Sequence, residues 1–454
     1  MPDSSSSLFS NPVSTLPHAL TLTPLSGPFS AVFAPPGSKS LTNRALLLAA
    51  LACGTSRMTG VLLADDSKRM LEALLALGFA VEVDEAAATA AVHGQGGTFP
   101  AQNASLFLGN AGTATRFLSA ALGLGAPGSA YVVDGIPRMR ERPIGQLVEP
   151  MRRLGAQVEC TLKEGFPPLL IRGGAAFRKG GSLTLAPTLS SQYVSALLQV
   201  APLLQEGLAI SFDGAITSRP YIEMTLRLMA LFGAKSAWDG NTVRVFPGGY
   251  SAFDYPVEPD ASSASYPLAA AAITPGSQIT VPGLGKDSLQ GDAAFCLVLE
   301  KMGCRVTQSA TSTTLAAPAD GILHGVDVDM NGIPDMAQTL ACVAVFAKGP
   351  TTIRDVGNLR VKETDRMEAL RVELTKLGAS VTVSGDDLTV VPPAGGQTLP
   401  AQIHTYDDHR MAMAFSLIGL RNPGVTLLDP ACCSKTWPAY FRDMARITGA
   451  DWKV

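Results

Sequence analysis

The chain has 454 residues, 46% of them hydrophobic and 16% charged, with a net charge of -3. This composition excludes a mainly disordered chain, because so many apolar side chains can bury the cores of two or three domains. The near balance of acidic and basic residues gives nucleic acid or an anionic membrane nothing general to bind, so any anion site must be local. The seven cysteines never form a Cys-x-x-Cys pair, which favours reduced thiols over disulfides or a zinc site.

The N-terminal segment, residues 1–20, is rich in Ser and Pro and is expected to form a flexible tail. The first basic residue is Lys39, so the segment lacks the positive charges of a secretory signal or a transit peptide. The most apolar run, Ala45 to Cys53, is far shorter than the roughly 20 residues that cross a bilayer. We therefore expect a soluble, cytoplasmic protein with no membrane-spanning segment.

A helical pattern that ends at a glycine and is followed by an alternating, strand-like pattern recurs along the chain. Apolar residues at helical spacing precede each glycine, which suits a helix closed by a residue in the left-handed conformation. The glycines follow one another at intervals of about 70 to 78 residues and are Gly78, Gly155, Gly233, Gly303, Gly378 and Gly449. The chain therefore contains six copies of one unit.

A second feature repeats in step with these glycines: a polar loop of small residues that opens directly into an almost wholly apolar helix. The loops contain Ser38 to Ser40, Asn110 to Thr113, Ser190 to Gln192, Asp260 to Ser263, Pro334 to Asp335, and Asp407 to His409. Each unit thus holds one helix that must be buried, one amphipathic helix that can cover a surface, and several short strands.

Six units of this size predict two similar α/β domains with three units each. Residues 254–259 contain the Pro and turn residues of a crossover between domains, and the chain must cross again near residues 34–37. We expect one domain to comprise residues 37–256 and the other to comprise residues 21–36 plus 257–454. A doubly wound nucleotide-binding enzyme is disfavoured, because no Gly-rich dinucleotide or Walker-type loop occurs in the required context.

The loops that open the buried helices are candidate anion sites, because helix N-termini offer unpaired N–H groups and the positive end of the helix dipole. Capping explains their Ser, Thr, Asp and Asn residues, but it does not explain the cations found with them. These cations are Lys39, Arg44, Arg116, Arg138, Arg140, Arg142, Arg360, Lys362, Arg366, Arg410 and Lys435. Each alone is more often a solvated surface charge, but several converging cations would bind a ligand with several negative charges.

Acidic residues among these cations are candidates for proton transfer or for ion pairing. Asp335, after an Ile-Pro pair, and Glu363, within a basic loop, are better placed to carry protons. For Asp365, Asp407 and Asp408, capping or ion pairing is at least as good an explanation. The five histidines are dispersed without a ligand spacing, which argues against a metal site, and no Gly-x-Ser-x-Gly nucleophile motif occurs.

Ten segments between about Ala31 and Phe441 resemble, in this order, those of the 5-enolpyruvylshikimate-3-phosphate synthase family of enolpyruvyl transferases. The segments are PPGSKSLTNRALLLAA, LGNAGTATRFL, RMRERPIG, LSSQYVSALL, SRPYIEMTL, DASSASYPLAAAAI, IPDMAQTLA, NLRVKETDRMEAL, TYDDHRMAMAFSL and SKTWPAYF. The resemblance implies an α/β fold, α+β by some schemes, of two domains. Each would hold three βαβαββ repeats in an inside-out α/β barrel, with the active site in the interdomain cleft.

The resemblance also implies a transferase of the shikimate pathway, which leads through chorismate to aromatic amino acids. The enzyme would transfer the enolpyruvyl group of phosphoenolpyruvate to the 5-hydroxyl of shikimate 3-phosphate through a tetrahedral intermediate and release phosphate. The family uses no metal and no cofactor. We expect only these two small molecules as partners, a monomer, and domain closure when shikimate 3-phosphate binds.

Two substrate pockets follow from the same resemblance. The residues implied for shikimate 3-phosphate are Lys39, Ser40, Arg44, Ser190, Ser191, Gln192, Ser218, Tyr221, Asp335, Asn358 and Lys362. Those implied for phosphoenolpyruvate are Lys39, Gly112, Arg142, Gln192, Arg366, Arg410 and Lys435. Four residues would be catalytic: Asp335 as the base on the 5-hydroxyl, Lys435 with Glu363 for proton transfer at the methylene carbon, and Lys39.

The chain departs from the common family pattern at Phe117, where many members have Pro. This change leaves inhibition by glyphosate, a competitor of phosphoenolpyruvate, open, while the retained Gly112 leaves room for the inhibitor's phosphonate and favours sensitivity.

Two alternative functions remain at this point. A UDP-N-acetylglucosamine enolpyruvyl transferase would have Lys-Asn in place of Lys39-Ser40 and a reactive Cys near RMRERPIG, yet no Cys lies between Cys53 and Cys160. A non-catalytic repeat protein that binds phosphorylated ligands would keep the cations and lose the proton carriers, but Asp335, Glu363 and Lys435 are all present.

Overall fold

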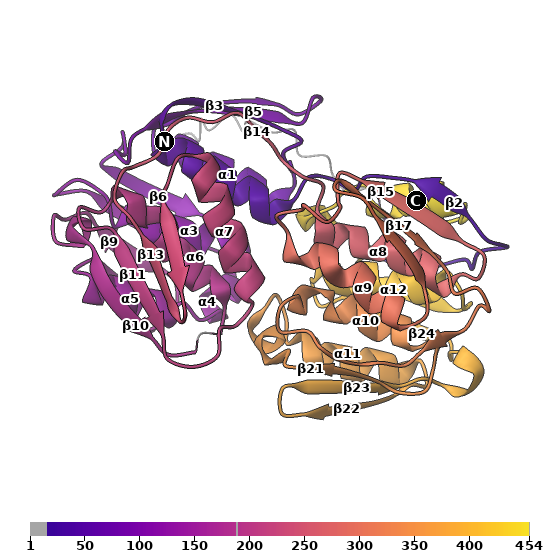
Figure 1. Ribbon diagram of the computed structural model, residues 1–454. Helices are drawn as coiled ribbons and strands as arrows, with labels where there is room; N and C mark the ends of the chain where they lie inside the picture. Colours follow the sequence, from indigo (N-terminus) through magenta and orange to yellow (C-terminus); the bar gives the residue numbers. More distant parts are fainter. Residues whose placement is uncertain (1–15, 188, 454) are drawn as a thin grey trace.

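The computed structural model describes residues 16–187 and 189–453, which form two lobes (Figure 1). Each lobe has its own hydrophobic core. One core runs from Leu41 to Val257, and the other combines residues near the N-terminus with the segment from Ala261 to Trp452. We call these lobes the first and second domain. Their separate cores support the proposal that residues 37–256 form one domain and residues 21–36 with 257–454 the other.

Each unit of the first domain contributes a four-stranded sheet with one parallel pair at an edge and two antiparallel pairs. In spatial order the sheets are β14 (Tyr255–Pro256), β3 (Cys53–Thr59), β5 (Thr89–Gln95), β4 (Ala80–Asp84); β6 (Asn103–Phe107), β7 (Ala130–Asp134), β9 (Leu169–Arg172), β8 (Gln157–Cys160); and β10 (Gly181–Leu185), β11 (Leu208–Phe212), β13 (Thr242–Val245), β12 (Ser236–Asp239). Because β14 follows the third unit but pairs with β3, the first sheet is completed only where the chain leaves this domain.

The second domain repeats the arrangement with strands borrowed from the N-terminus. Its sheets are β16 (Arg305–Gln308), β17 (Ser312–Ala316), β15 (Gln278–Pro282), β2 (Ser30–Val32); β19 (Asp327–Asp329), β21 (Thr351–Arg354), β23 (Asp387–Val391), β22 (Ser380–Ser384); β1 (Ala19–Thr21), β25 (Val425–Leu428), β24 (Ala401–His404); and the pair β18 (Leu323–His324), β20 (Ala347–Lys348). The expected tail is therefore wrong for Ala19 and Leu20, which pair with β25. The expectation for residues 1–15 lies outside the described residues.

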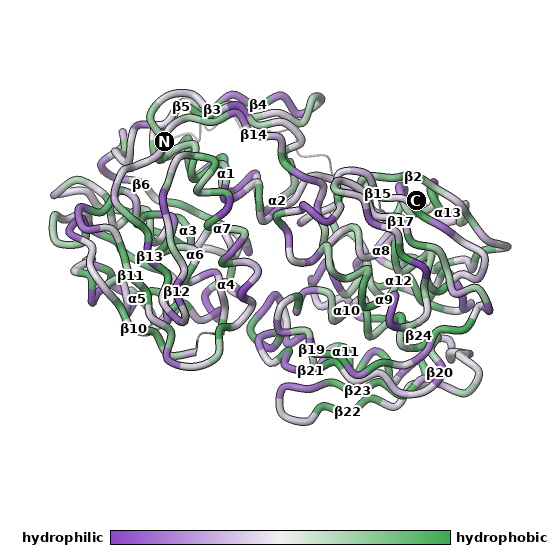
Figure 2. The backbone as a smooth tube through the Cα atoms, in the orientation of Figure 1, coloured by the Kyte–Doolittle hydropathy of each residue, from purple (hydrophilic) through white to green (hydrophobic). Residues whose placement is uncertain are grey.

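Three apolar helices occupy the centre of each domain, as the sequence predicts. They are α1 (Lys39–Leu51), α3 (Gly112–Leu122) and α6 (Ser191–Val200), and α8 (Ala261–Ile273), α10 (Ala337–Ala344) and α12 (His409–Gly419). Figure 2 shows these central segments as mainly hydrophobic. Sheets and the other helices surround them: α2 (Asp65–Ala76), α4 (Pro137–Glu141), α5 (Gly145–Arg153), α7 (Arg219–Leu231), α9 (Phe295–Lys301), α11 (Arg366–Lys376) and α13 (Tyr440–Thr448). Short 3-10 helices cover Phe177–Lys179, Ala201–Leu203, Gly291–Ala294, Pro334–Met336, Gly357–Val361, Ala394–Gly396 and Pro430–Lys435.

The six glycines at the helix ends all have positive φ, from 77° at Gly449 to 113° at Gly303. A Cβ is strained in this region, so glycine is the residue that lets each helix stop and the next strand begin. The predicted left-handed helix ends are confirmed.

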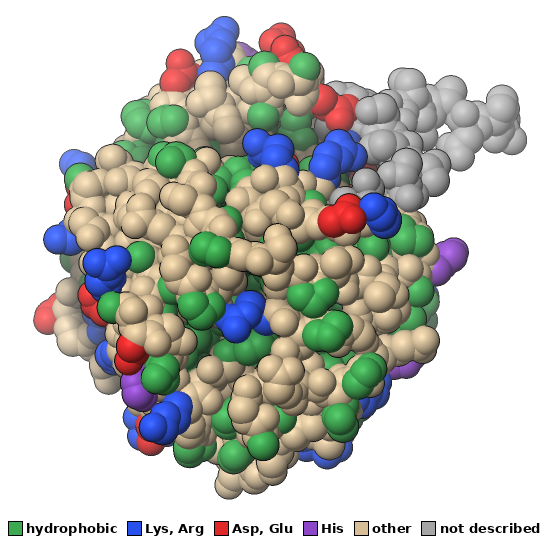
Figure 3. Space-filling view, turned by 90° about the vertical axis from the view of Figure 1, so that its right-hand side faces the viewer, with side chains coloured by type: hydrophobic (Ala, Val, Ile, Leu, Met, Phe, Trp, Pro, Cys, Tyr) green, Lys and Arg blue, Asp and Glu red, His purple; other side chains and the backbone are tan. Residues whose placement is uncertain are grey.

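Side-chain caps fix where central helices begin. Ser38 accepts a hydrogen bond from the backbone N–H of Leu41 at the start of α1, and Asp408 accepts one from that of Arg410 at the start of α12. Across the described ranges, no helix combines the length and apolarity needed to cross a membrane. On the face in Figure 3, basic and acidic side chains are scattered among neutral and apolar ones rather than gathered into one patch.

Candidate active site

The starts of the central helices of both domains meet at two adjoining pockets. The serine pocket is lined by Lys39, Ser40, Arg44, Thr113, Ser190, Ser191, Gln192, Ser218, Tyr221, Pro334, Asp335, Asn358 and Lys362. The arginine pocket is lined by Lys39, Asp66, Gly112, Thr113, Arg142, Gln192, Asp335, Lys362, Glu363, Arg366 and Arg410. Since Lys39, Asp335 and Lys362 line both, ligands in the two pockets would share these charges.

The structure places all residues expected to bind shikimate 3-phosphate at the serine pocket. The residues expected to bind phosphoenolpyruvate line the arginine pocket, except Lys435. The Nζ of Lys435 lies 2.9 Å from Oδ1 of Asp66 and 3.8 Å from Oε1 of Glu363, at the border of the arginine pocket. The geometry thus assembles the predicted set, while the role of each residue stays a prediction.

Arg44 is held in the serine pocket by neutral groups. Its Nε donates to Thr225 Oγ1 at 2.8 Å, and one terminal nitrogen donates to the Ser40 carbonyl at 3.0 Å. The guanidinium lies over the ring of Phe117, 4.8 Å from its centroid. Phe117, which stands where many family members have Pro, therefore packs against a cation that is predicted to bind substrate. Burial lowers the pKa of Arg44 to about 9, and an anionic ligand beside the guanidinium would stabilise its protonated form and raise this pKa.

The second domain completes the serine pocket. The backbone N–H of Ser218 donates to Asn331 Oδ1 at 3.0 Å, and Asn358 Nδ2 donates to Ser218 Oγ at 3.3 Å. Ser218 itself has a φ of 53° at the start of α7, a strained conformation for a serine. This strained residue of the first domain is therefore fixed by two asparagines of the second.

Arg366 is the centre of the arginine pocket, with only 1% of the residue exposed. Its guanidinium donates to both carboxylate oxygens of Asp408, at 2.7 and 3.1 Å. It also donates to Glu363 Oε2 at 2.9 Å and to Asp335 Oδ1 at 3.2 Å. One cation thus orients three carboxylates drawn from different segments of the second domain.

Asp335 is surrounded by cations, because Lys362 and Arg410 lie 3.2 and 3.1 Å from its two oxygens in addition to Arg366. Burial favours the neutral acid, but the charges of Lys362, Arg410 and Arg366 outweigh it and hold the pKa of Asp335 well below its usual range. Glu363 behaves similarly: burial opposes its ionisation, yet Arg366 and neighbouring cations hold its pKa well below the usual range. Both carboxyls are therefore ionised before substrate binds.

Arg142 and Gly112 form the opposite wall of the arginine pocket. Arg142 is 5% exposed, and one terminal nitrogen donates to the carbonyl and side-chain oxygens of Asn110 at 3.2 and 3.0 Å. A Cβ on Gly112 would lie 2.7 Å from the other terminal nitrogen of Arg142. Glycine is thus required for this guanidinium to lie against the start of α3.

Asp66 and Asp292 at the site were not predicted from the sequence, and Arg138 was predicted only as one of several candidate cations, with no partner assigned. Asp66 pairs with two lysines, and Arg138 crosses between the domains, where its Nε and a terminal nitrogen donate to the carbonyls of Glu363 and Lys362 at 2.9 and 3.0 Å. Asp292 accepts from Tyr221 Oη at 2.9 Å. In the sequence, Asp66 resembles an ordinary acid in the first turn of a helix, and only tertiary structure reveals its partners.

The acids left open in the sequence are now placed. Asp365 caps α11 by accepting from the Glu368 N–H at 3.1 Å, and Asp408 both caps α12 and pairs with Arg366. Asp407 is exposed, although partial desolvation of its carboxyl raises its pKa. Among the described residues, no cluster of His, Cys, Asp and Glu could hold a metal ion, and the seven cysteines are free.

A model of the family "EPSP synthase (3-phosphoshikimate 1-carboxyvinyltransferase)" matches residues 25–444. The chain belongs to this family. It is 50% identical over 427 residues to the chloroplastic 3-phosphoshikimate 1-carboxyvinyltransferase of Brassica napus, with 91% of this chain and 82% of that one covered. It is also 50% identical over 417 residues to the 3-phosphoshikimate 1-carboxyvinyltransferase of Serratia proteamaculans (strain 568), with 91% and 95% covered.

Among solved structures, the chain is similar to an EPSP synthase from Acinetobacter baumannii, with a TM-score of 0.78 and 24% identity. The similarity covers 96% of this chain and 100% of that one. It shows the fold, and the two-domain α/β architecture predicted from the sequence is confirmed.

Proposed function

We propose that this member of the EPSP synthase family transfers the enolpyruvyl group of phosphoenolpyruvate to the 5-hydroxyl of shikimate 3-phosphate and releases phosphate. The observation that carries the proposal is the pair of adjoining pockets, one rich in serine and one in arginine, that share Lys39, Asp335 and Lys362. Hydroxyls and Arg44 suit a phosphorylated sugar-like acid, and the guanidiniums of Arg366 and Arg410 suit a compact substrate with a carboxylate and a phosphate.

Substrate binding replaces the internal ion pairs. A substrate carboxylate placed against Arg366 and Arg410 competes with Asp335, which now pairs with both. Each cation that turns to the substrate ceases to stabilise the Asp335 anion, so the pKa of Asp335 rises toward a value useful for a base. Asp335 thus holds these cations in place and becomes more basic when substrate binds.

The reaction then follows from groups on the two sides of the site. Asp335 takes the proton of the 5-hydroxyl while the hydroxyl oxygen forms a bond to the central carbon of phosphoenolpyruvate. Lys435 with Glu363 delivers a proton to the methylene carbon of phosphoenolpyruvate. In the resulting tetrahedral intermediate, the Lys435–Glu363 pair takes a proton back from the new methyl group as the bond between the central carbon and the phosphate oxygen breaks, which releases phosphate and forms the enol ether. Lys39 and Arg142 face the departing phosphate and stabilise its charge by being oriented beforehand.

Contacts between domains support closure around the substrates. Arg138, Asn331 and Lys435 each donate a hydrogen bond to the other domain, or accept one from it, next to the pockets. A closed site excludes water from the intermediate. Small-angle scattering should give a smaller radius of gyration with saturating shikimate 3-phosphate than without it; an unchanged radius would contradict closure driven by this substrate.

The decisive experiment measures phosphate release from phosphoenolpyruvate with two acceptors. Turnover with shikimate 3-phosphate and none with UDP-N-acetylglucosamine is the expected result, and the reverse would overturn the proposal. The monomer and the cytoplasmic location expected from the sequence stay predictions, which gel filtration and cell fractionation would test.

A further inference from the structure

We infer that Asp66 is a positioning residue that holds the two lysines of the active site, Lys39 of the first domain and Lys435 of the second, by one carboxylate. The inference rests on the proposed function. Asp66 is the second residue of α2, and its side chain is 4% exposed. Its Oδ2 lies 3.3 Å from the Nζ of Lys39, and its Oδ1 lies 2.9 Å from the Nζ of Lys435. Each carboxylate oxygen therefore serves a different lysine.

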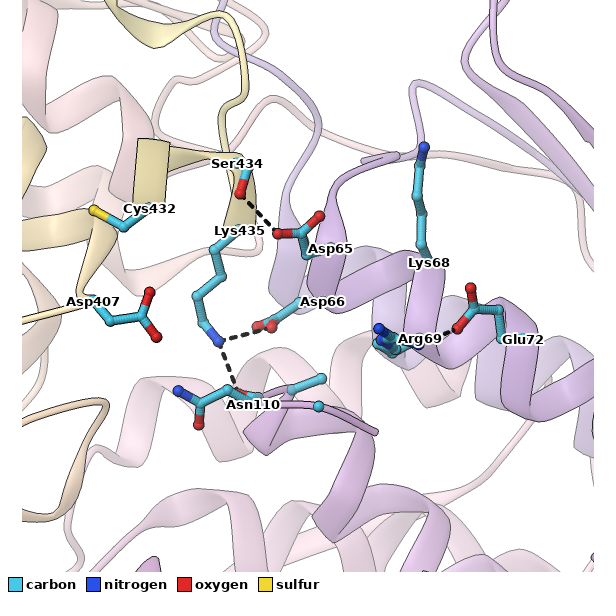
Figure 4. A pocket seen from close by; sticks show the side chains of 12 residues that line it. Asp65, Asp66, Lys68, Arg69, Glu72, Asn110, Asp407, Cys432, Ser434 and Lys435 are labelled. Atoms are coloured by element: carbon cyan, nitrogen blue, oxygen red, sulfur yellow. Dashed lines mark hydrogen bonds and ion pairs between the residues drawn. The ribbon is translucent and has the colours of Figure 1, made fainter. Parts of the chain in front are cut away.

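Lys435 is oriented mainly by the domain to which it does not belong. Its backbone is in the 3-10 helix Pro430–Lys435 of the second domain, but its Nζ donates to the Asn110 carbonyl at 2.8 Å and pairs with Asp66, both in the first domain. Figure 4 shows the side chain extended toward these two groups. Glu363, its nearest acid in the second domain, is further away at 3.8 Å. The ammonium is thus in its working position only when the domains are together.

The charge of Asp66 matters because the lysines have the same sign. Both ammoniums are largely buried, with side-chain exposures of 13% for Lys39 and 9% for Lys435. Without a carboxylate between them they repel each other, and repulsion across the interface opposes closure. Asp66 also lies in the first turn of α2, so its negative charge is at the positive end of the helix dipole.

Asp66 acts through the lysines rather than on a substrate. It lines the arginine pocket and also a neighbouring cavity of about 210 Å³ (Figure 4), but both of its oxygens are engaged by ammonium groups. A bare carboxylate would repel a phosphate, whereas this one presents two cations to it. Its removal should therefore disturb the cations and leave the hydroxyls of the serine pocket intact.

The adjacent Asp65 provides a matched control. It lies on the same helix and also reaches the second domain, since Ser434 Oγ donates to its Oδ2 at 2.8 Å, but no lysine pairs with it in the described part of the chain. The same substitution at the two positions separates the loss of an interface hydrogen bond from the loss of the lysine bridge.

The test measures phosphate release with shikimate 3-phosphate and phosphoenolpyruvate, together with thermal unfolding, for the native protein, Asp66→Asn, Asp66→Glu and Asp65→Asn. For Asp66→Asn we expect kcat to fall by about tenfold to a hundredfold, the loss typical of a misplaced proton-transfer group, and KM for phosphoenolpyruvate to rise. Asp66→Glu, which keeps the charge, should recover part of kcat, and Asp65→Asn should stay within about twofold of native kcat, well below one tenfold step.

Three results would overturn the inference: native kcat and KM in Asp66→Asn, an equal loss in Asp65→Asn, or a loss in Asp66→Asn that merely follows its folded fraction. If the native protein itself fails to release phosphate with shikimate 3-phosphate, the proposed function fails instead. The two failures are therefore distinguishable.

Discussion

Replacing Arg366 with Ala tests the idea that one buried guanidinium holds the second domain's half of the site together. The substitution removes a cationic partner from three acids, Asp335, Glu363 and Asp408. Asp408 has no exposed surface and loses both of its hydrogen bonds from Arg366. Breaking a buried ion pair by removing one partner costs about 3–5 kcal/mol, which in a domain of this size lowers Tm by roughly 6–20 °C. Asp335 and Glu363 lose a cation as well, so the upper half of this range is expected.

Thermal unfolding of the native protein, Arg366→Ala and Arg371→Ala would measure this effect. Arg371 lies on the same helix and pairs with Glu368 at 2.6 Å, but that pair is exposed, so its removal should change Tm little. The difference between native protein and Arg366→Ala should be largest near neutral pH. Asp335 and Glu363 have folded-state pKa values below normal, so their stabilisation is present above pH 4 to 5 and is lost as pH falls. An Arg366→Ala variant with a Tm within about 2 °C of native at pH 7 would refute the reasoning, because it corresponds to no more than about 1 kcal/mol.

Three further predictions concern single groups of the site. Asp335→Asn should keep phosphoenolpyruvate binding by calorimetry and lose about 10²–10⁴-fold in kcat; near-normal turnover would remove Asp335 from the mechanism. Burial, followed by the nearby Asp335, raises the pKa of Asp292 to about 6, so ionising it costs the folded state about 3 kcal/mol as pH rises from about 4 to above 6. The Tm of Asp292→Asn relative to native should therefore increase between pH 4.5 and pH 7, and an unchanged difference would contradict the raised pKa. Gly112→Ala should displace the Arg142 guanidinium and raise KM for phosphoenolpyruvate severalfold, while Gly27→Ala, whose Cβ meets no atom within 4 Å, should not; equal KM values would show that Arg142 does not bind there.

The sequence predicts the repeat architecture because its signals are local. A glycine after an amphipathic run is forced by backbone geometry at the helix end, and each of the six has the expected positive φ. The apolar runs that follow polar loops are equally direct, since a helix that is hydrophobic all round must be buried. The strand Ala19–Thr21 has no such signal: its three residues follow a Ser- and Pro-rich segment, and only pairing with β25 orders it.

The sequence predicts the cations of the candidate site but not the groups with which the charged side chains pair. Lys39, Arg44 and Arg410 stand out because a charge in the first turns of an otherwise apolar helix is unusual. Asp66 does not stand out, because an acid in a first helical turn is common at surfaces, and Arg138 is predicted only as one of several cations, without its contact to the second domain. Their importance comes from the partner that the other domain supplies, and a pairing over hundreds of residues leaves no periodic pattern in a single sequence.

The site has acidic side chains beside the cations that are proposed to bind anionic substrates. Repulsion between those cations explains why the acids are needed. Without acids beside them, Arg366 and Arg410 would repel each other and turn toward solvent. Substrate binding would then have to reorient both side chains in every catalytic cycle. Asp335 and Asp408 prevent this because they form ion pairs with these guanidiniums before substrate binds. Asp408 caps α12 with its backbone-facing oxygen and remains in place, whereas Asp335 has only side-chain cations as partners among the described groups and can yield them to a substrate. In the proposed mechanism the two acids therefore have different roles. Asp408 holds Arg366 throughout, whereas Asp335 holds Arg366 and Arg410 until the substrate carboxylate replaces it, and the pKa of Asp335 then rises.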